Sequence, residues 1–135
     1  MIEMELSKIV INETRSEQLI LLKEKGGSRA LPIVIGINEA SSIRLELSGF
    51  VPPRPLTHDL LKSSIEKLGG RLKKIVIDKL ENNTFHAKLV IGNHSKWDLF
   101  VDARPSDGIA LAVRAKVPIF VEEKVLIKAE SQEEL

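Results

Sequence analysis

An apolar helix late in the chain constrains the fold more than any other segment. Pro105 suits the first turn of a helix, and residues 108–113 read Gly-Ile-Ala-Leu-Ala-Val, with no polar side. A helix that is apolar all round is normally buried. We therefore expect this helix to run through the centre of the protein. Its charged entrance, Asp102-Ala103-Arg104-Pro105-Ser106-Asp107, should stay at the surface.

Composition and charge limit the class of protein. The 135 residues suffice for one ordinary domain, and 43% hydrophobic with 29% charged residues is typical of a globular domain. Cysteine is absent, which excludes disulfides and cysteine-bearing zinc sites. Neither a signal peptide nor an apolar run of about 20 residues is present, so we expect a cytoplasmic protein without membrane association. The net charge of +1 means that any nucleic-acid contact depends on a local basic patch.

Stretches rich in β-branched residues alternate with turn signals and helical patterns, which predicts an α+β fold. Strands are expected at residues 5–11, 18–24, 31–35, 72–78, 84–91, 96–101 and 117–121. Besides the apolar helix, two helices are expected, with Asn38 and Thr57 as N-caps. Residues 1–127 should form a single domain, followed by a polar, disordered tail over residues 128–135.

Two pairs of segments match each other in the same order along the chain. Residues 6–11 (Leu-Ser-Lys-Ile-Val-Ile) match residues 72–77 (Leu-Lys-Lys-Ile-Val-Ile), and the segment at Glu39 matches the segment at Asp107 at nearly the same spacing. These matches predict two β-β-β-α repeats joined by an additional helix over residues 57–68. Glu39 and Asp107 would then occupy equivalent helix starts.

Three blocks of sequence carry a family resemblance. They are Leu31–Gly36 with Glu39-Ala40, Pro53–Leu60, and Asp102–Asp107 with Ile109–Ala112. Through these blocks the chain resembles the bifunctional nuclease domain family over roughly residues 3–126. The resemblance implies an α+β fold, a homo-oligomer that is most often a dimer, and nuclease activity toward DNA and RNA. Gly108 stands where that family usually has alanine, which weakens the helix slightly.

Phosphodiester hydrolysis requires an activated water and positive charge for the phosphate. The candidate catalytic residues are His58, Asp59, Asp102 and Asp107. The candidate phosphate-binding residues, which can form two-pronged hydrogen bonds, are Arg54 and Arg104. The candidate ligands for Mg²⁺ or Mn²⁺ are Glu39, Asp102 and Asp107. We therefore predict a metal-dependent nuclease of low sequence specificity that acts on DNA, RNA or both.

The same residues also allow a structural interpretation. Acids in first helical turns stabilise the helix dipole without any catalytic role, which applies to Glu39, Asp59 and Asp107. Arg104 can pair with Asp102 and brace the strand-to-helix junction. The alternative is then a non-enzymatic ligand-binding or oligomerisation module held together by salt bridges, in which Arg104→Ala lowers the melting temperature by several degrees. Carboxylates that converge in an open cleft favour the nuclease, and closed ion pairs favour the module.

Aromatic residues and the remaining histidines contribute little to this hypothesis. Aromatic residues make up 4% of the chain, and Trp97 and the four phenylalanines lie mostly in apolar patterns, so we expect them in the core. Without base stacking, nucleic-acid binding should be weak, tolerant of sequence and strongly salt-dependent. We expect His86 on the solvent face of a strand and His94 in a turn without an acidic cluster nearby.

Overall fold

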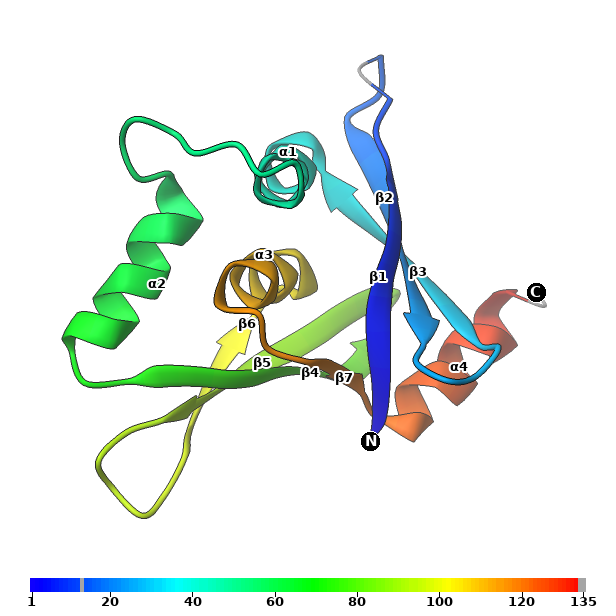
Figure 1. Ribbon diagram of the computed structural model, residues 1–135. Coiled ribbons are helices and arrows are strands. Elements are labelled where there is room, and N and C mark those ends of the chain that lie inside the picture. Colours follow the sequence, from blue (N-terminus) through cyan, green and yellow to red (C-terminus); the bar gives the residue numbers. More distant parts are fainter. Residues whose placement is uncertain (13, 134–135) are drawn as a thin grey trace.

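The computed structural model describes residues 1–12 and 14–133 and has mixed strand and helix content (Figure 1). The strands are β1 (Ile2–Val10), β2 (Glu17–Glu24), β3 (Ala30–Gly36), β4 (Arg71–Glu81), β5 (Thr84–Gly92), β6 (Leu99–Ala103) and β7 (Ile119–Val121). The helices are α1 (Ile37–Leu47), α2 (Thr57–Lys67), α3 (Pro105–Ala115) and α4 (Glu123–Glu133). This content confirms the α+β class. No helix within the described ranges combines the length and the hydropathy needed to cross a membrane.

The strands form one curled sheet with the order β3-β2-β1-β7-β4-β5-β6. Strands β1, β2 and β3 form one antiparallel meander, and β4, β5 and β6 form another. The short strand β7 joins them, because it pairs antiparallel with β1 and parallel with β4. Figure 1 shows that the two meanders run in very different directions, so the sheet wraps around α3. Pro32 lies in the edge strand β3, where a missing N–H is tolerated.

The element order strand-strand-strand-helix occurs twice in the chain. It appears first as β1-β2-β3-α1 and again as β4-β5-β6-α3, with α2 between the two units. In both units the helix follows directly on an edge strand of the sheet. Glu39 and Asp107 accordingly both lie in the first turn of their helices. The duplication itself stays a prediction, because a shared element order does not establish a common origin.

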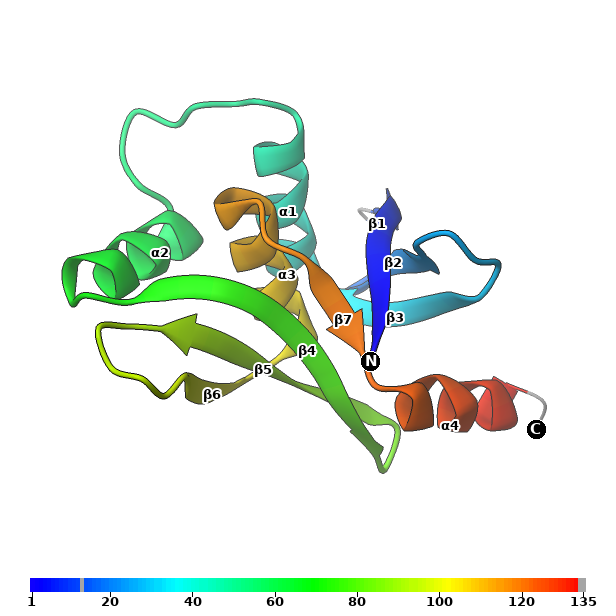
Figure 2. The same ribbon diagram turned by 60° about the horizontal axis from the view of Figure 1, so that its bottom comes forward.

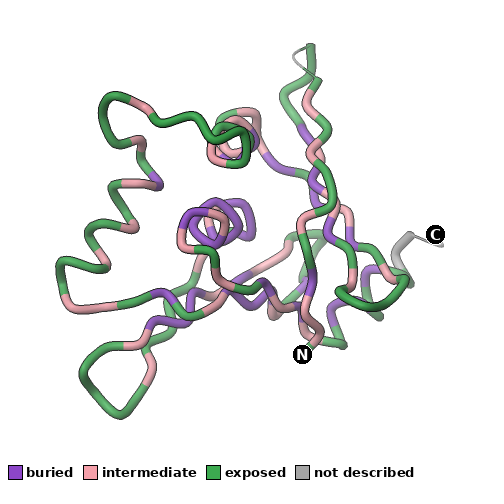
Figure 3. Tube along the Cα trace, viewed as in Figure 1, coloured by how far each residue is buried: buried purple, intermediate pink, exposed green. Residues whose placement is uncertain are grey.

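Helix α3 occupies the centre of the protein, which confirms the expectation from its apolar sequence. Ile109, Ala110 and Leu111 are fully buried. The helix contacts α1, α2, β4 and β5, and Figure 3 shows it as a mostly buried segment enclosed by these elements. Figure 2 shows α1, α2 and α3 grouped together and α4 separated from them, beyond β7. Because α3 is anchored on all sides, the residues at its start are held in place by the core.

Gly108 lies where α3 packs directly on β4. A Cβ atom added at Gly108 would lie 2.8 Å from Cγ2 of Ile75, a fully buried side chain. We expect Gly108→Ala to lower the free energy of unfolding by about 1 kcal/mol, because the overpacking outweighs the gain in helix propensity. Chemical denaturation measures this change. Ile75→Leu removes the clashing Cγ2, so the double variant should recover the lost free energy of unfolding. A Gly108→Ala single variant that is more stable than the wild type would contradict the overpacking.

Neither predicted N-cap residue occupies the cap position. Asn38 lies inside α1, whose N-cap is Gly36, and Thr57 is the first residue of α2, whose N-cap is Leu56. In α2 the capping function falls to a carboxylate. The Oδ2 atom of Asp59 accepts a hydrogen bond from the Leu56 N–H at 2.9 Å. The prediction was wrong because it assigned the cap to the first short polar side chain, although an acid at the third helical position can instead accept from the N–H of the residue before the helix.

The C-terminal segment also differs from the expectation of a disordered tail. Residues 128–133 continue α4, because Val125, Leu126 and Ala129 recur on one helix face and are buried. The guanidinium of Arg29, in the turn between β2 and β3, forms ion pairs with Glu24 and with Glu123 at the start of this helix. Residues 134 and 135 lie outside the described residues, and a domain boundary at residue 127 stays a prediction.

Three aromatic side chains are exposed, although the sequence pattern predicted them in the core. Trp97, Phe100 and Phe50 are 71%, 64% and 51% exposed. Phe100 lies on the edge strand β6, and Trp97 lies in the loop before that strand. Phe50 lies in the linker between α1 and α2. The prediction was wrong because an apolar stretch on an edge strand or in a linker is not necessarily covered by another element.

Candidate functional site

Arg104 connects the starts of α1 and α3. Its Nε and Nη2 atoms donate hydrogen bonds to Oδ2 and Oδ1 of Asp107 at 2.8 and 3.1 Å, and its Nη1 lies 3.1 Å from Oε1 of Glu39. The Arg104 side chain is 64% exposed, whereas those of Glu39 and Asp107 are 20% and 28% exposed. The hydrogen bonds to Asp107 raise the pKa of Arg104. A permanently charged guanidinium therefore covers two half-buried carboxylates and remains open to solvent.

His58, at the start of α2, reaches the same carboxylate. Its Nε2 lies 2.9 Å from Oδ1 of Asp107, and its Nδ1 lies 2.7 Å from Oγ of Ser42 on α1. His58 is buried, with 9% of its surface exposed. A consistent assignment places the proton on Nε2, which donates to Asp107, and lets Nδ1 accept the proton of the Ser42 hydroxyl. The basic nitrogen of a neutral imidazole then faces α1.

Asp107 is the shared acceptor of the cluster. Burial by itself raises the pKa of Asp107, but hydrogen bonds from Arg104 and His58, together with the positive charge of Arg104, outweigh this effect. The pKa of Asp107 is therefore held below its ordinary value. An ionised carboxylate at neutral pH can orient the imidazole of His58 and stabilise a positive charge that develops on it.

Arg114 and Ser42 belong to the same network, although neither is among the residues predicted from the sequence. Arg114 donates from Nε to Oδ1 of Asp59 at 2.8 Å, from Nη1 to the Ala110 carbonyl at 2.9 Å, and from Nη2 to the carbonyl and Oγ of Ser42 at 3.2 and 3.1 Å. Its side chain is 3% exposed. A single arginine in an apolar helix signals a buried, paired charge. That signal points to Arg114, whereas nothing in the sequence distinguishes Ser42 from other surface serines.

Asp59 has its oxygens occupied by protein donors. Oδ1 accepts from Arg114, and Oδ2 accepts from the Leu56 N–H. Burial raises the pKa of Asp59, but these hydrogen bonds and the charge of Arg114 outweigh it and hold the pKa low. This arrangement is typical of a structural carboxylate that joins α2 to α3. Each oxygen accepts one hydrogen bond and the side chain is 29% exposed, so the catalytic role predicted for Asp59 stays a prediction.

Asp102 and Arg54 lie apart from the network. Asp102 is exposed on β6, where it pairs in the ladder with Lys88 of β5. Arg54 is exposed in the linker between α1 and α2. Neither residue takes part in an ion pair within residues 1–12 and 14–133, so the expected Arg104–Asp102 brace is replaced by the pairs of Arg104 with Glu39 and Asp107. The structure thus brings together five of the predicted site residues: Glu39, His58, Arg104 and Asp107 through direct contacts, and Asp59 through Arg114 and Ser42.

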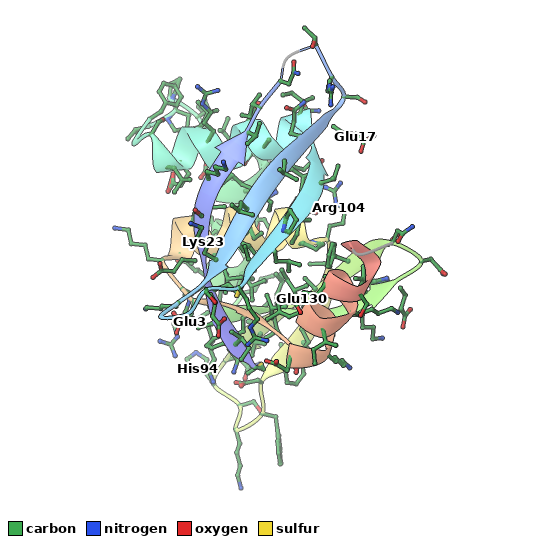
Figure 4. All side chains as sticks on the ribbon, turned by 90° about the vertical axis from the view of Figure 1, so that its right-hand side faces the viewer. Glu3, Glu17, Lys23, His94, Arg104 and Glu130 are labelled. Carbon is green, nitrogen blue, oxygen red and sulfur yellow. The ribbon has the colours of Figure 1, made fainter. Side chains whose placement is uncertain are left out.

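A hollow of about 550 Å³ opens over this cluster. Its charged and polar lining includes Glu39, Ser42, His58, Arg104 and Asp107. A second hollow of about 440 Å³ borders Arg104 on the side of β3 and Glu17. Figure 4 shows Arg104 and Glu17 at the same side of the molecule, with His94 at a distant end. Arg104 is therefore accessible from two hollows, whereas His94 lies far from both the arginine and its partners.

The cluster does not fit a divalent cation as it stands. Two of the three expected ligands, Glu39 and Asp107, are paired with Arg104, and the third, Asp102, lies on β6 outside the cluster. No group of three or more histidine, aspartate or glutamate side chains that could hold a metal ion occurs in the described part of the chain. A guanidinium that already neutralises two carboxylates opposes the binding of a second cation. The chemistry available at this cluster is therefore that of its own side chains.

The fold and the cluster together define an α+β domain with a polar site where α1, α2 and α3 begin. The chain belongs to the bifunctional nuclease domain family, whose family profile matches residues 20–134. An uncharacterized protein of Mycobacterium tuberculosis is 45% identical over 127 residues, which cover 94% of this chain and 75% of that protein. The resemblance seen in the sequence blocks is thereby confirmed.

Plant proteins of this family are similar over a smaller share of their own length. Bifunctional nuclease 2 of Oryza sativa subsp. japonica is 32% identical over 115 residues, which cover 82% of this chain and 35% of the rice protein. Bifunctional nuclease 1 of Arabidopsis thaliana is 29% identical over 106 residues, which cover 76% of this chain and 32% of the plant protein. The chain thus corresponds to about a third of these plant nucleases.

Proposed function

We propose that this protein is a nuclease that hydrolyses phosphodiester bonds of DNA, RNA or both with low sequence specificity. One observation carries the proposal: Arg104, Asp107, His58 and Ser42 form a continuous hydrogen-bonded chain along the wall of one hollow. This hydrogen-bonded chain occurs in a member of the bifunctional nuclease domain family, which supports nucleic acid as the substrate.

Arg104 is suited to bind the phosphate. Its guanidinium is exposed at the rim of the hollow and can form two-pronged hydrogen bonds with phosphate oxygens. A phosphate can replace Glu39, which holds Arg104 through a single nitrogen, while the two hydrogen bonds to Asp107 keep the arginine in place. The positive charge then lies where negative charge increases as the phosphate is attacked.

His58 is suited to move the proton. As a water attacks phosphorus, the new O–P bond forms and the bond to the leaving oxygen breaks. The water's proton passes through the Ser42 hydroxyl to Nδ1 of His58, and Asp107 stabilises the resulting imidazolium through Nε2. The same proton can then return to the leaving oxygen. At this cluster the contacts are made to phosphate, which carries no sequence information, so we expect low sequence specificity and weak, salt-dependent binding there.

A second candidate function is favoured by the closed pairing of the charges. Glu39, Asp59 and Asp107 each have an arginine partner, as the structural interpretation of the sequence expected. In this case the charges hold α1, α2 and α3 together, and the hollow binds an anionic ligand without hydrolysing it. The same module could assemble into the dimer that the family resemblance implies.

A cleavage assay tests the proposed nuclease. We expect Arg104→Ala to cleave fluorescently labelled DNA and RNA oligonucleotides about 10²-fold more slowly than the wild type, the usual effect of removing one donor to the reacting group. Arg44→Ala, which removes an exposed arginine of α1, is the matched control. The assay is run with Mg²⁺, Mn²⁺ or EDTA, which tests the predicted metal requirement. Equal rates for Arg104→Ala and the wild type would assign the activity to a contaminant and contradict the proposal.

A further inference from the structure

Contacts between a lysine and an aromatic ring are concentrated in one part of the sheet. Such contacts occur about once per 70–80 residues in proteins. Here three of them involve β4, β5, β6, β7 or the loop before β6, with ammonium-to-centroid distances of 5.3–5.9 Å. The pairs are Lys74 with Phe120, Lys88 with Phe100, and Lys96 with Trp97.

Two of these pairs share one face of the sheet. Side chains of residues directly opposite each other in a ladder lie on the same face. The ladder pairs that define the face are Lys74 with Val90, Val90 with Phe100, Val76 with Lys88, and Val76 with Phe120. We call Lys74, Lys88, Phe100 and Phe120 the lysine–phenylalanine face. Helix α3 packs on the opposite face, which carries Ile75.

The lysine–phenylalanine face has an apolar floor, an exposed ring at Phe100 and a partly buried ring at Phe120. Val76 and Val90 are 1% and 2% exposed beneath the lysine and phenylalanine side chains, whereas Phe100 is 64% exposed. Within the described residues, neither Lys74 nor Lys88 takes part in an ion pair. Asp102 is the ladder neighbour of Lys88, but the Lys88 ammonium lies over the Phe100 ring. Flat apolar surface and available positive charge thus occur side by side.

We propose that the lysine–phenylalanine face, extended by Trp97, binds the unpaired bases and phosphates of single-stranded nucleic acid. Unpaired bases can stack on aromatic rings, which a duplex does not allow without unstacking, and lysines contact the phosphates between them. The proposal rests on the proposed nuclease function and adds a binding surface to it. Strand β6 connects this face with the cluster, because Phe100 lies four residues before Arg104 on one continuous segment. A nucleic-acid strand bound to the lysine–phenylalanine face would cross the edge of the sheet at β6 and reach the phosphate site at Arg104.

A binding assay without hydrolysis tests this surface. Fluorescence anisotropy of a labelled oligothymidylate is measured with His58→Ala as the parent, so that the probe stays intact. We expect Phe100→Ala in this parent to weaken binding about ten-fold. Phe50→Ala removes a similarly exposed phenylalanine from the linker between α1 and α2 and should leave the affinity unchanged. Lys88→Glu should weaken binding and flatten its dependence on salt concentration.

Two results would overturn the proposal. The first is equal affinity of the Phe100→Ala and Phe50→Ala proteins for the oligothymidylate. The second is a change from dimer to monomer in Phe100→Ala, seen by light scattering, without a change in affinity; edge strand β6 would then be an interface between two copies of the chain. Binding is measured here without cleavage. Failure of the nuclease proposal would therefore appear in the cleavage assay, and failure of the present proposal would appear in the anisotropy assay.

Discussion

His58→Ala is expected to slow phosphodiester hydrolysis by about 10²- to 10⁴-fold, the usual contribution of a positioned proton-transfer group. The reason is geometric: one ring nitrogen contacts the carboxylate of Asp107 and the other contacts the hydroxyl of Ser42, so His58 is the only link between them within the described residues. Single-turnover cleavage of a labelled oligonucleotide measures the loss of the chemical step without interference from product release.

His94→Ala is the matched control for this experiment. His94 is exposed in the loop between β5 and β6, far from Arg104 in Figure 4, so its removal should leave the rate unchanged. Thermal unfolding of both variants separates a loss of chemistry from a loss of folded protein, since His58 is buried and also holds α2 against α3. Equal rates for His58→Ala and His94→Ala, with both proteins folded, would refute the role of His58.

Arg114→Ala is expected to lower the free energy of unfolding by about 3–5 kcal/mol, because it breaks the pair with Asp59, leaves buried acceptors without a donor and removes a buried side chain. Arg114 is 3% exposed and contacts three elements through four hydrogen bonds. For a domain of this size, the melting temperature should fall by roughly 10–20 °C. Calorimetry or circular dichroism measures this change.

Arg104→Ala is the natural comparison, because the structural interpretation of the sequence, the alternative to a nuclease, expected this arginine to be the stabilising one. Its side chain is 64% exposed, so its ion pairs with Glu39 and Asp107 are screened by water and should contribute about 1 kcal/mol or less. Asp59→Asn combined with Arg114→Ala should recover part of the stability, since no unpaired carboxylate remains. If Arg114→Ala lowered the free energy of unfolding less than Arg104→Ala does, Arg114 would not be the main stabilising arginine.

The sequence predicted the elements of the fold better than their pairing. The apolar composition of α3 identified the buried centre, and β-branched stretches located the strands, because both signals are local. The place of β7 between β1 and β4 is set by contacts between residues far apart in the chain, which local periodicity does not contain. Helix α4 was missed for a different reason: Val125, Leu126 and Ala129 recur at helical spacing, but the polar composition of residues 128–135 was interpreted as a tail.

The candidate site shows the same division between local and long-range information. Glu39, His58, Arg104 and Asp107 lie at helix starts, and the fold brings these starts together. Asp102 was expected in the site because the strand before it was predicted to end at residue 101. Strand β6 instead extends to Ala103, and alternation along the strand then places Asp102 on the same side as Phe100, away from α3.

The position of β7 also has a consequence for biosynthesis. The sheet becomes continuous through three ladder pairs between β1 and β7 and three between β7 and β4. Since β7 follows all other strands in the chain, the ribosome releases both meanders before the strand that unites them. During translation, the edge of β1 that later pairs with β7 therefore has unpaired N–H and C=O groups. A nascent chain stalled before Ile119 would expose this edge to pairing with strands of other proteins.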